Sequence, residues 1–154
     1  MKKIITILLV LAFLLHVSGC TFHEDVVANS LGKISKEEFF TDGGFQDRSE
    51  YAKYSYKDVD FTNNSYFKQM TEADEEQLKA RIDVFEQWVE VIKEGDPNHD
   101  LVVHYDFDAS VISKNDYLYV NDSYEDPDDP MFSSFQVYFF DAETMTLYYF
   151  HHNI

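Results

Sequence analysis

The sequence contains little cysteine, proline or glycine: one, three and five residues respectively in a chain of 154. A single cysteine excludes an intramolecular disulfide, so packing alone must hold the fold. The glycines are too few for a glycine-rich phosphate loop, and the sequence lacks both the spaced histidines of a zinc protease helix and a serine nucleophile elbow. The familiar enzyme signatures are therefore absent, and we predict neither catalytic residues nor a cofactor.

Basic residues are also scarce. Twelve Lys and Arg stand against 29 Asp and Glu, which gives a formal net charge of −17 at pH 7. This charge excludes nucleic acid as a partner, because such partners are bound through basic surfaces. It leaves an unknown protein or a neutral ligand as the partner, or cations, and it would also keep a monomeric surface domain soluble.

The first twenty residues indicate export. Lys2 and Lys3 precede an apolar run over residues 4–17, and Val17-Ser18-Gly19-Cys20 follows. The run is shorter than the roughly 20 residues that span a bilayer, so it predicts a cleaved signal peptide over residues 1–19.

The sequence Val17-Ser18-Gly19-Cys20 resembles the lipobox of bacterial lipoproteins, with Val17 where leucine is usual. The resemblance implies that the Cys20 thiol carries diacylglycerol and that the new amino terminus is acylated. Two acyl chains are enough for stable anchoring. We therefore expect a membrane-anchored protein on the extracytoplasmic face of the cell membrane. The alternative is a soluble secreted protein.

The mature chain has the size of one domain. Residues 20–34 contain few large apolar side chains and are predicted to be a lipidated tether, which leaves residues 35–154 as a single α+β domain. The Ser-x-x-Glu spacing from Ser35 to Glu38 predicts a short helical turn. Two periodicities compete over residues 45–70, which we interpret as short helices with a break near residues 58–60.

Residues 72–94 predict a long amphipathic helix. Thr71 and Asp74 have the spacing of an N-terminal cap, and Gly95 and Pro97 end the pattern. The apolar residues recur at steps of three and four and so form one stripe that faces the core, with Trp88 beside it. The stripe consists of Leu78, Ile82, Phe85, Val89 and Ile92.

Four later segments have the character of strands. Residues 101–108 alternate apolar and polar side chains, and residues 117–120, 135–140 and 147–151 are rich in aromatic and β-branched residues. Short links between them predict a four-stranded antiparallel meander, with residues 141–144 as a hairpin turn and the long helix across one face. This architecture resembles in outline the cystatin-like and nuclear-transport-factor-like folds, a likeness that implies no function.

Two groups of residues could hold a cation. An acidic loop offers carboxylate oxygens of the kind that calcium prefers, although it lacks the glycine and final glutamate of an EF-hand, so a solvated loop is the alternative. His104, Asp106 and Asp108 would share one face of an extended strand, near His151 and His152, where a transition metal could bind. The acidic loop residues are Asp122, Glu125, Asp126, Asp128 and Asp129.

Aromatic residues exceed what a sheet facing one helix requires. Their excess could form a recognition surface, because tyrosine gives large contact area at low entropy cost, or it could cover the second sheet face against residues 39–67. We take binding or interaction as the leading function, with cation binding through the 122–129 loop and a surface hydrolase with a carboxylate acid/base pair as alternatives. The candidate binding residues are Tyr117, Tyr119, Tyr138 and Tyr148.

Overall fold

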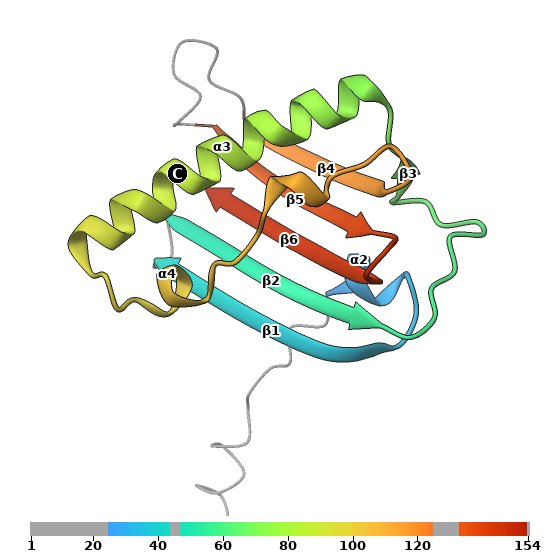
Figure 1. Ribbon diagram of the computed structural model, residues 1–154, viewed down its shortest axis with the longest axis horizontal. Helices are drawn as coiled ribbons and strands as arrows, with labels where there is room; N and C mark the ends of the chain where they lie inside the picture. The colour runs from blue at the N-terminus through green and yellow to red at the C-terminus, as the bar shows by residue number, and fades with distance from the viewer. Residues whose placement is uncertain (1–24, 44–46, 125–132, 154) are drawn as a thin grey trace, which may run out of the picture.

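The computed structural model describes residues 25–43, 47–124 and 133–153, which form an α+β fold (Figure 1). Within these residues a single antiparallel sheet has six strands in the order β1-β2-β6-β5-β4-β3. The predicted class is confirmed, but the predicted number of four strands is wrong. The strands are β1 (Ile34–Gly43), β2 (Arg48–Tyr56), β3 (Lys68–Gln69), β4 (Tyr117–Tyr124), β5 (Ser134–Asp141) and β6 (Thr146–Asn153).

The long helix α3 (Glu72–Gly95) confirms the prediction for this segment and lies across one face of the sheet, here called the first face (Figure 1). Its capping box is complete: Asp74 N donates to Thr71 Oγ1 at 3.3 Å, and Thr71 N donates to Asp74 Oδ2 at 2.9 Å. Hydrogen bonds from Lys68 and Thr71 lower the pKa of Asp74 to about 2. None of the described helices is long and apolar enough to cross a membrane.

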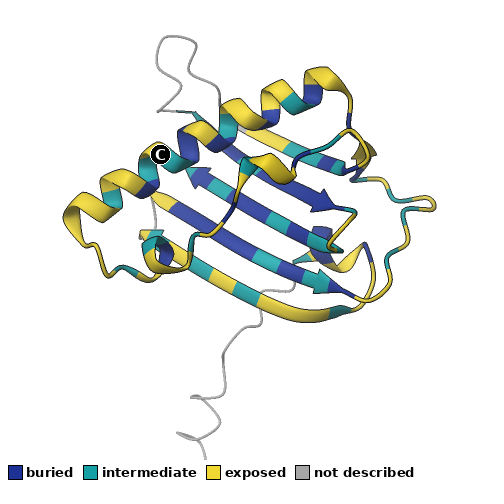
Figure 2. Ribbon diagram, in the orientation of Figure 1, coloured by how far each residue is buried: buried dark blue, intermediate teal, exposed yellow. Residues whose placement is uncertain are grey.

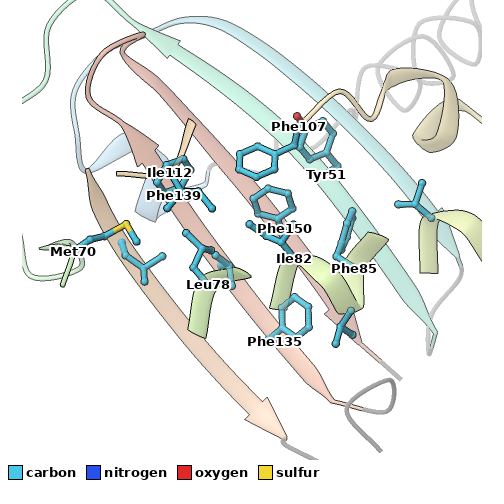
Figure 3. Packing of buried hydrophobic residues seen from close by; sticks show 14 of the residues in the cluster. Tyr51, Met70, Leu78, Ile82, Phe85, Phe107, Ile112, Phe135, Phe139 and Phe150 are labelled. Atoms are coloured by element: carbon cyan, nitrogen blue, oxygen red, sulfur yellow. The ribbon is translucent and has the colours of Figure 1, made fainter. Parts of the chain in front are cut away.

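The core between α3 and the first face is built from aromatic and aliphatic side chains (Figure 3). Phe85 is completely buried, and its ring centroid lies 5.5 Å from that of Phe150 and 5.7 Å from that of Tyr105. Trp88 is half-buried at the side of the predicted stripe. The stripe itself is confirmed, since its residues Leu78, Ile82, Phe85 and Val89 are buried and Ile92 packs against the cluster.

The opposite face of the sheet, here called the second face, is covered by α2 (Val26–Asn29) and by the segment 57–67. Ala28 and Leu31 are 0% and 1% exposed. The Tyr56 hydroxyl donates to the Ala28 carbonyl at 2.8 Å, and Phe61 stacks on Tyr117 with centroids 3.7 Å apart. The central strands are therefore buried on both faces, as Figure 2 shows for β2, β5 and β6.

Three predictions for the first half of the chain are wrong. Residues 25–34, the described part of the predicted tether, belong to the folded structure. The helical turn predicted from Ser35 to Glu38 lies inside β1, and β2 replaces the helices predicted over residues 45–70. The physical reason is strand pairing, because β1 and β2 form a long hairpin that overrides the local helix signals. In addition, β2 is buried on both faces, and a strand of this kind shows no alternation of polar and apolar residues.

The prediction of a strand over residues 101–108 is also wrong. The segment begins with the short helix α4 (Asp100–His104) and continues to the 3₁₀ helix η1 (Ala109–Val111). Its alternation arises because separate turns bury Leu101 and Phe107 against the same core. Local caps favour the turns: the Leu101 amide donates to His99 Nδ1 at 3.2 Å, and the Ser110 amide donates to Asp108 Oδ1 at 2.9 Å.

Candidate functional site

The candidate site lies where β2 begins and β6 ends. The two strands pair so that Glu50 stands opposite His151 and Ser49 stands opposite His152. Because successive strand residues point to opposite faces, the two pairs occupy opposite sides of the sheet. Ser49 Oγ lies 3.1 Å from His152 Nδ1 in the core beneath α3, whereas Glu50 and His151 meet on the second face.

Glu50 makes hydrogen bonds with three neighbours. The Tyr149 hydroxyl donates to Oε2 at 3.2 Å, His151 Nδ1 lies 2.8 Å from the same oxygen, and Arg48 Nη2 donates to Oε1. The Glu50 side chain is 5% exposed, whereas those of His151 and Arg48 are 18% and 45% exposed. A buried carboxylate is thus held by two groups that reach solvent.

The electrostatics keep this carboxylate charged. Burial by itself raises the pKa of Glu50, but hydrogen bonds from His151 and Arg48 outweigh burial and hold the pKa below its ordinary value. Glu50 is therefore ionised at neutral pH. Burial, together with the neighbouring Tyr138 and Glu50, raises the pKa of the Tyr149 hydroxyl far above its ordinary range, so this hydroxyl remains a donor.

The pair of Glu50 and His151 has a defined chemistry. An ionised carboxylate can only accept, so His151 Nδ1 carries a proton and donates it to Glu50 in a hydrogen bond. The other ring nitrogen, Nε2, accepts a hydrogen bond in a neutral imidazole and donates one in an imidazolium. Arg48 uses one of its nitrogens on Glu50, and a guanidinium has five N–H donors in all. These groups together can hydrogen-bond a polar partner through both a donor and an acceptor.

A second carboxylate on the same face is linked to the site through aromatic rings. Asp25 Oδ2 accepts from the hydroxyls of Tyr54 and Tyr138, each at 3.2 Å. The Tyr138 ring lies 4.6 Å from the ring of Tyr149, whose hydroxyl bonds Glu50. Asp25 also caps α2 by accepting from the Val27 and Ala28 amides at 3.0 Å. It thereby fixes the start of the described chain to the centre of the second face.

The four tyrosines predicted as a recognition surface do not share one face of the sheet. Tyr117, Tyr119 and Tyr138 lie on the second face, and Tyr148 lies on the first. Tyr138 is 6% exposed, and Tyr117 stacks on Phe61. This packing matches the alternative prediction in part: residues 57–67 of the predicted segment 39–67 cover the second face together with α2, whereas β1 and β2 belong to the sheet itself.

The acidic loop is described only in part. Asp122 on β4 forms an ion pair with Arg81 of α3, whose Nε donates to Asp122 Oδ1 at 2.9 Å. The other predicted cation ligands lie outside the described residues, so the cation site stays a prediction. They are Glu125, Asp126, Asp128 and Asp129.

The predicted histidine and carboxylate strand site is not formed. His104 ends α4 and stacks on Phe40 with centroids 4.5 Å apart, while Asp106 accepts from the Tyr51 hydroxyl at 2.9 Å and Asp108 caps η1. Over residues 25–43, 47–124 and 133–153, no group of three or more His, Cys, Asp or Glu could hold a metal ion.

Sequence reasoning missed Glu50 because residues 45–70 were assigned to helices. In an extended strand, the step of two that runs from Arg48 through Glu50 to Ala52 and Tyr54 places these residues on one face. No polar and apolar alternation marks that step in the sequence, because β2 is buried on both faces. The pairing of β2 with β6, which brings His151 to Glu50 across 101 residues of chain, is not visible in the sequence either.

Comparison with protein-family models, with curated proteins and with solved structures found no match. A functional proposal must therefore depend on the amino-terminal sequence and on the geometry of the second face.

Proposed function

We propose that the protein is a lipid-anchored extracytoplasmic binding module that recognises a polar partner, a protein or a neutral ligand, through Arg48, Glu50 and His151. The lipobox-like sequence ending at Cys20 supports the anchor. The buried Glu50 carboxylate, with His151 and Arg48 between it and solvent, is the observation that carries the binding function.

Burying a charged carboxylate costs free energy. Taking a carboxylate out of water has a penalty of several kcal/mol, and apolar residues of similar volume often give equal or greater stability. Tyr138 and Tyr149 on the same face show that this sheet accepts large apolar side chains. A charged group maintained among them points to a role other than stability, and perturbed titratable groups concentrate at functional sites.

The anchor gives the first testable prediction. Cys20→Ser removes the thiol that would carry diacylglycerol, so the variant should keep its signal peptide, run at higher apparent mass and lose its partition into the detergent phase. Mass spectrometry of the purified wild-type protein should find acyl chains on Cys20. A variant that matures normally and still partitions with detergent contradicts the anchor.

The binding site gives the second prediction. In intact cells, chemical crosslinking of the wild-type protein should yield a defined adduct, and His151→Gln should abolish it because glutamine cannot present the imidazole Nε2. His104→Gln is the matched control, since His104 is an exposed histidine at the end of α4. If mass spectrometry finds equal adduct yields for the two variants, the Glu50 and His151 pair does not take part in recognition.

A further inference from the structure

We infer that a short tether holds the α2 side of the sheet toward the membrane and presents α3 away from it. This inference rests on the proposed lipid anchor at Cys20. Asp25 is the first described residue and follows Cys20 by five residues, and n residues of fully extended chain span at most about 3.6 Å each. The distance from the anchored Cys20 to Asp25 is therefore at most about 18 Å.

This maximum distance restricts the orientation on the membrane because Asp25 has a fixed position in the fold. Its carboxylate accepts from Tyr54 of β2 and Tyr138 of β5, so Asp25 lies over β6, which is between these two strands. Leu31 O accepts from the Asp60 amide at 3.0 Å, which joins the end of α2 to the segment 57–67. The attachment point is thus firmly held on the second face.

If the α3 side faced the membrane, the chain between Cys20 and Asp25 would have to be longer than it is. The nearer sheet edge, β1, is two strand spacings from β6, which is roughly 10 Å. From that edge the chain would have to pass the layer of α3, about 10 Å from the sheet, and the helix radius of about 5 Å. The path of about 25 Å exceeds the available 18 Å, so the α3 side cannot face the bilayer.

Charge favours the same orientation. Helix α3 carries eight acidic and three basic residues, and Figure 2 shows its outer side as exposed. The segments that flank the attachment point are nearly balanced: residues 25–33 and 57–66 together hold three acidic residues and two lysines, Lys33 and Lys57. Anionic headgroups repel acidic surfaces over a Debye length of about 8 Å, so the acidic helix is more stable on the side away from the membrane.

Lysine acylation on vesicles tests this orientation. The mature protein purified from membranes is reconstituted in phosphatidylcholine vesicles and treated with a water-soluble acylating reagent, and modified lysines are counted by mass spectrometry. Lys33 and Lys57 are exposed beside α2, whereas Lys79 and Lys93 are exposed on α3. Vesicles should slow acylation of the first pair several-fold relative to detergent solution and leave the second pair unchanged. Equal slowing of both pairs, or slowing of the α3 pair alone, overturns the inference.

A spacer variant isolates the role of tether length. Inserting twenty Gly and Ser residues after Thr21 raises the mean reach of the tether to roughly 28 Å, so the protection of Lys33 and Lys57 should disappear. Protection that persists would show that length does not set the orientation. If Cys20 proves not to be lipidated, coupling this single thiol to a maleimide lipid still tests the orientation, so failure of the anchor and failure of the inference are separate results.

Discussion

Phe85→Ala will lower the free energy of unfolding by about 3–5 kcal/mol, which is comparable to the whole stability of a small domain. Phe85 is fully buried and touches the rings of Tyr105 and Phe150, so its removal leaves a cavity where α3 meets β6. The contact with Phe150 joins the helix to the sheet (Figure 3). Urea unfolding followed by far-UV circular dichroism measures the change.

Val91→Ala is the matched control for Phe85→Ala. Val91 lies on the same helix and is 48% exposed, so its truncation should change stability by less than about 0.5 kcal/mol. Similar losses in the two variants would mean that α3 does not pack through the Phe85 stripe. An unchanged unfolding midpoint in Phe85→Ala would show that α3 does not pack in the core.

The long helix could be predicted from the sequence because all of its signals are local. The cap at Thr71, the period of the stripe and the stop at Gly95 lie within one segment and agree with one another. The strands β5 and β6 could be predicted for the same reason, because they are aromatic runs separated by a short turn. Asp141 stabilises this turn by accepting from the Glu143 amide at 2.9 Å and the Thr144 hydroxyl at 2.6 Å.

The β1 and β2 hairpin could not be predicted because its signals are spread through the fold. The β2 strand is covered on both faces, so the period of two in its side chains is hidden. In β1, Glu38 follows Ser35 with the spacing of a capping box, yet this edge strand is fixed by nine residue pairs with β2. Tertiary pairing overrides a local helix signal of this strength.

The candidate site was missed for a related reason. Arg48, Glu50, Tyr149 and His151 come from two strands at opposite ends of the folded sequence, and each residue alone resembles an ordinary surface or core residue. These residues become neighbours because β6 lies between β2 and β5 in the sheet. Predicting the site would have required the strand order, which the short connections of a simple meander do not indicate.

Glu50→Ala will lower the free energy of unfolding by about 2–3 kcal/mol at neutral pH, because it leaves buried donors without their acceptor. The Tyr149 hydroxyl and His151 Nδ1 both lose Glu50 Oε2 in this variant. The loss is smaller than for a fully buried ion pair, since the partially exposed Arg48 can bind water instead. Urea unfolding against the wild-type protein gives the value.

The Glu50→Gln variant separates charge from shape. In the folded protein the pKa of Glu50 lies below its ordinary value of 4.5, so the ionised carboxylate stabilises the fold above that pH. This stabilisation is lost as the pH falls through the lower folded-state pKa. The difference in stability between wild type and Glu50→Gln should therefore be largest near pH 7 and shrink steadily below about pH 4.

Glu76→Gln controls for the removal of any one charge from this acidic chain, since Glu76 is exposed on the outer side of α3. Relief of general repulsion would make both glutamine variants slightly more stable than wild type at neutral pH. A specific role for the Glu50 carboxylate instead makes Glu50→Gln less stable and leaves Glu76→Gln nearly unchanged. If the two variants behave alike at every pH, the carboxylate is not held by Arg48 and His151 in solution, and the basis for recognition at this site is lost.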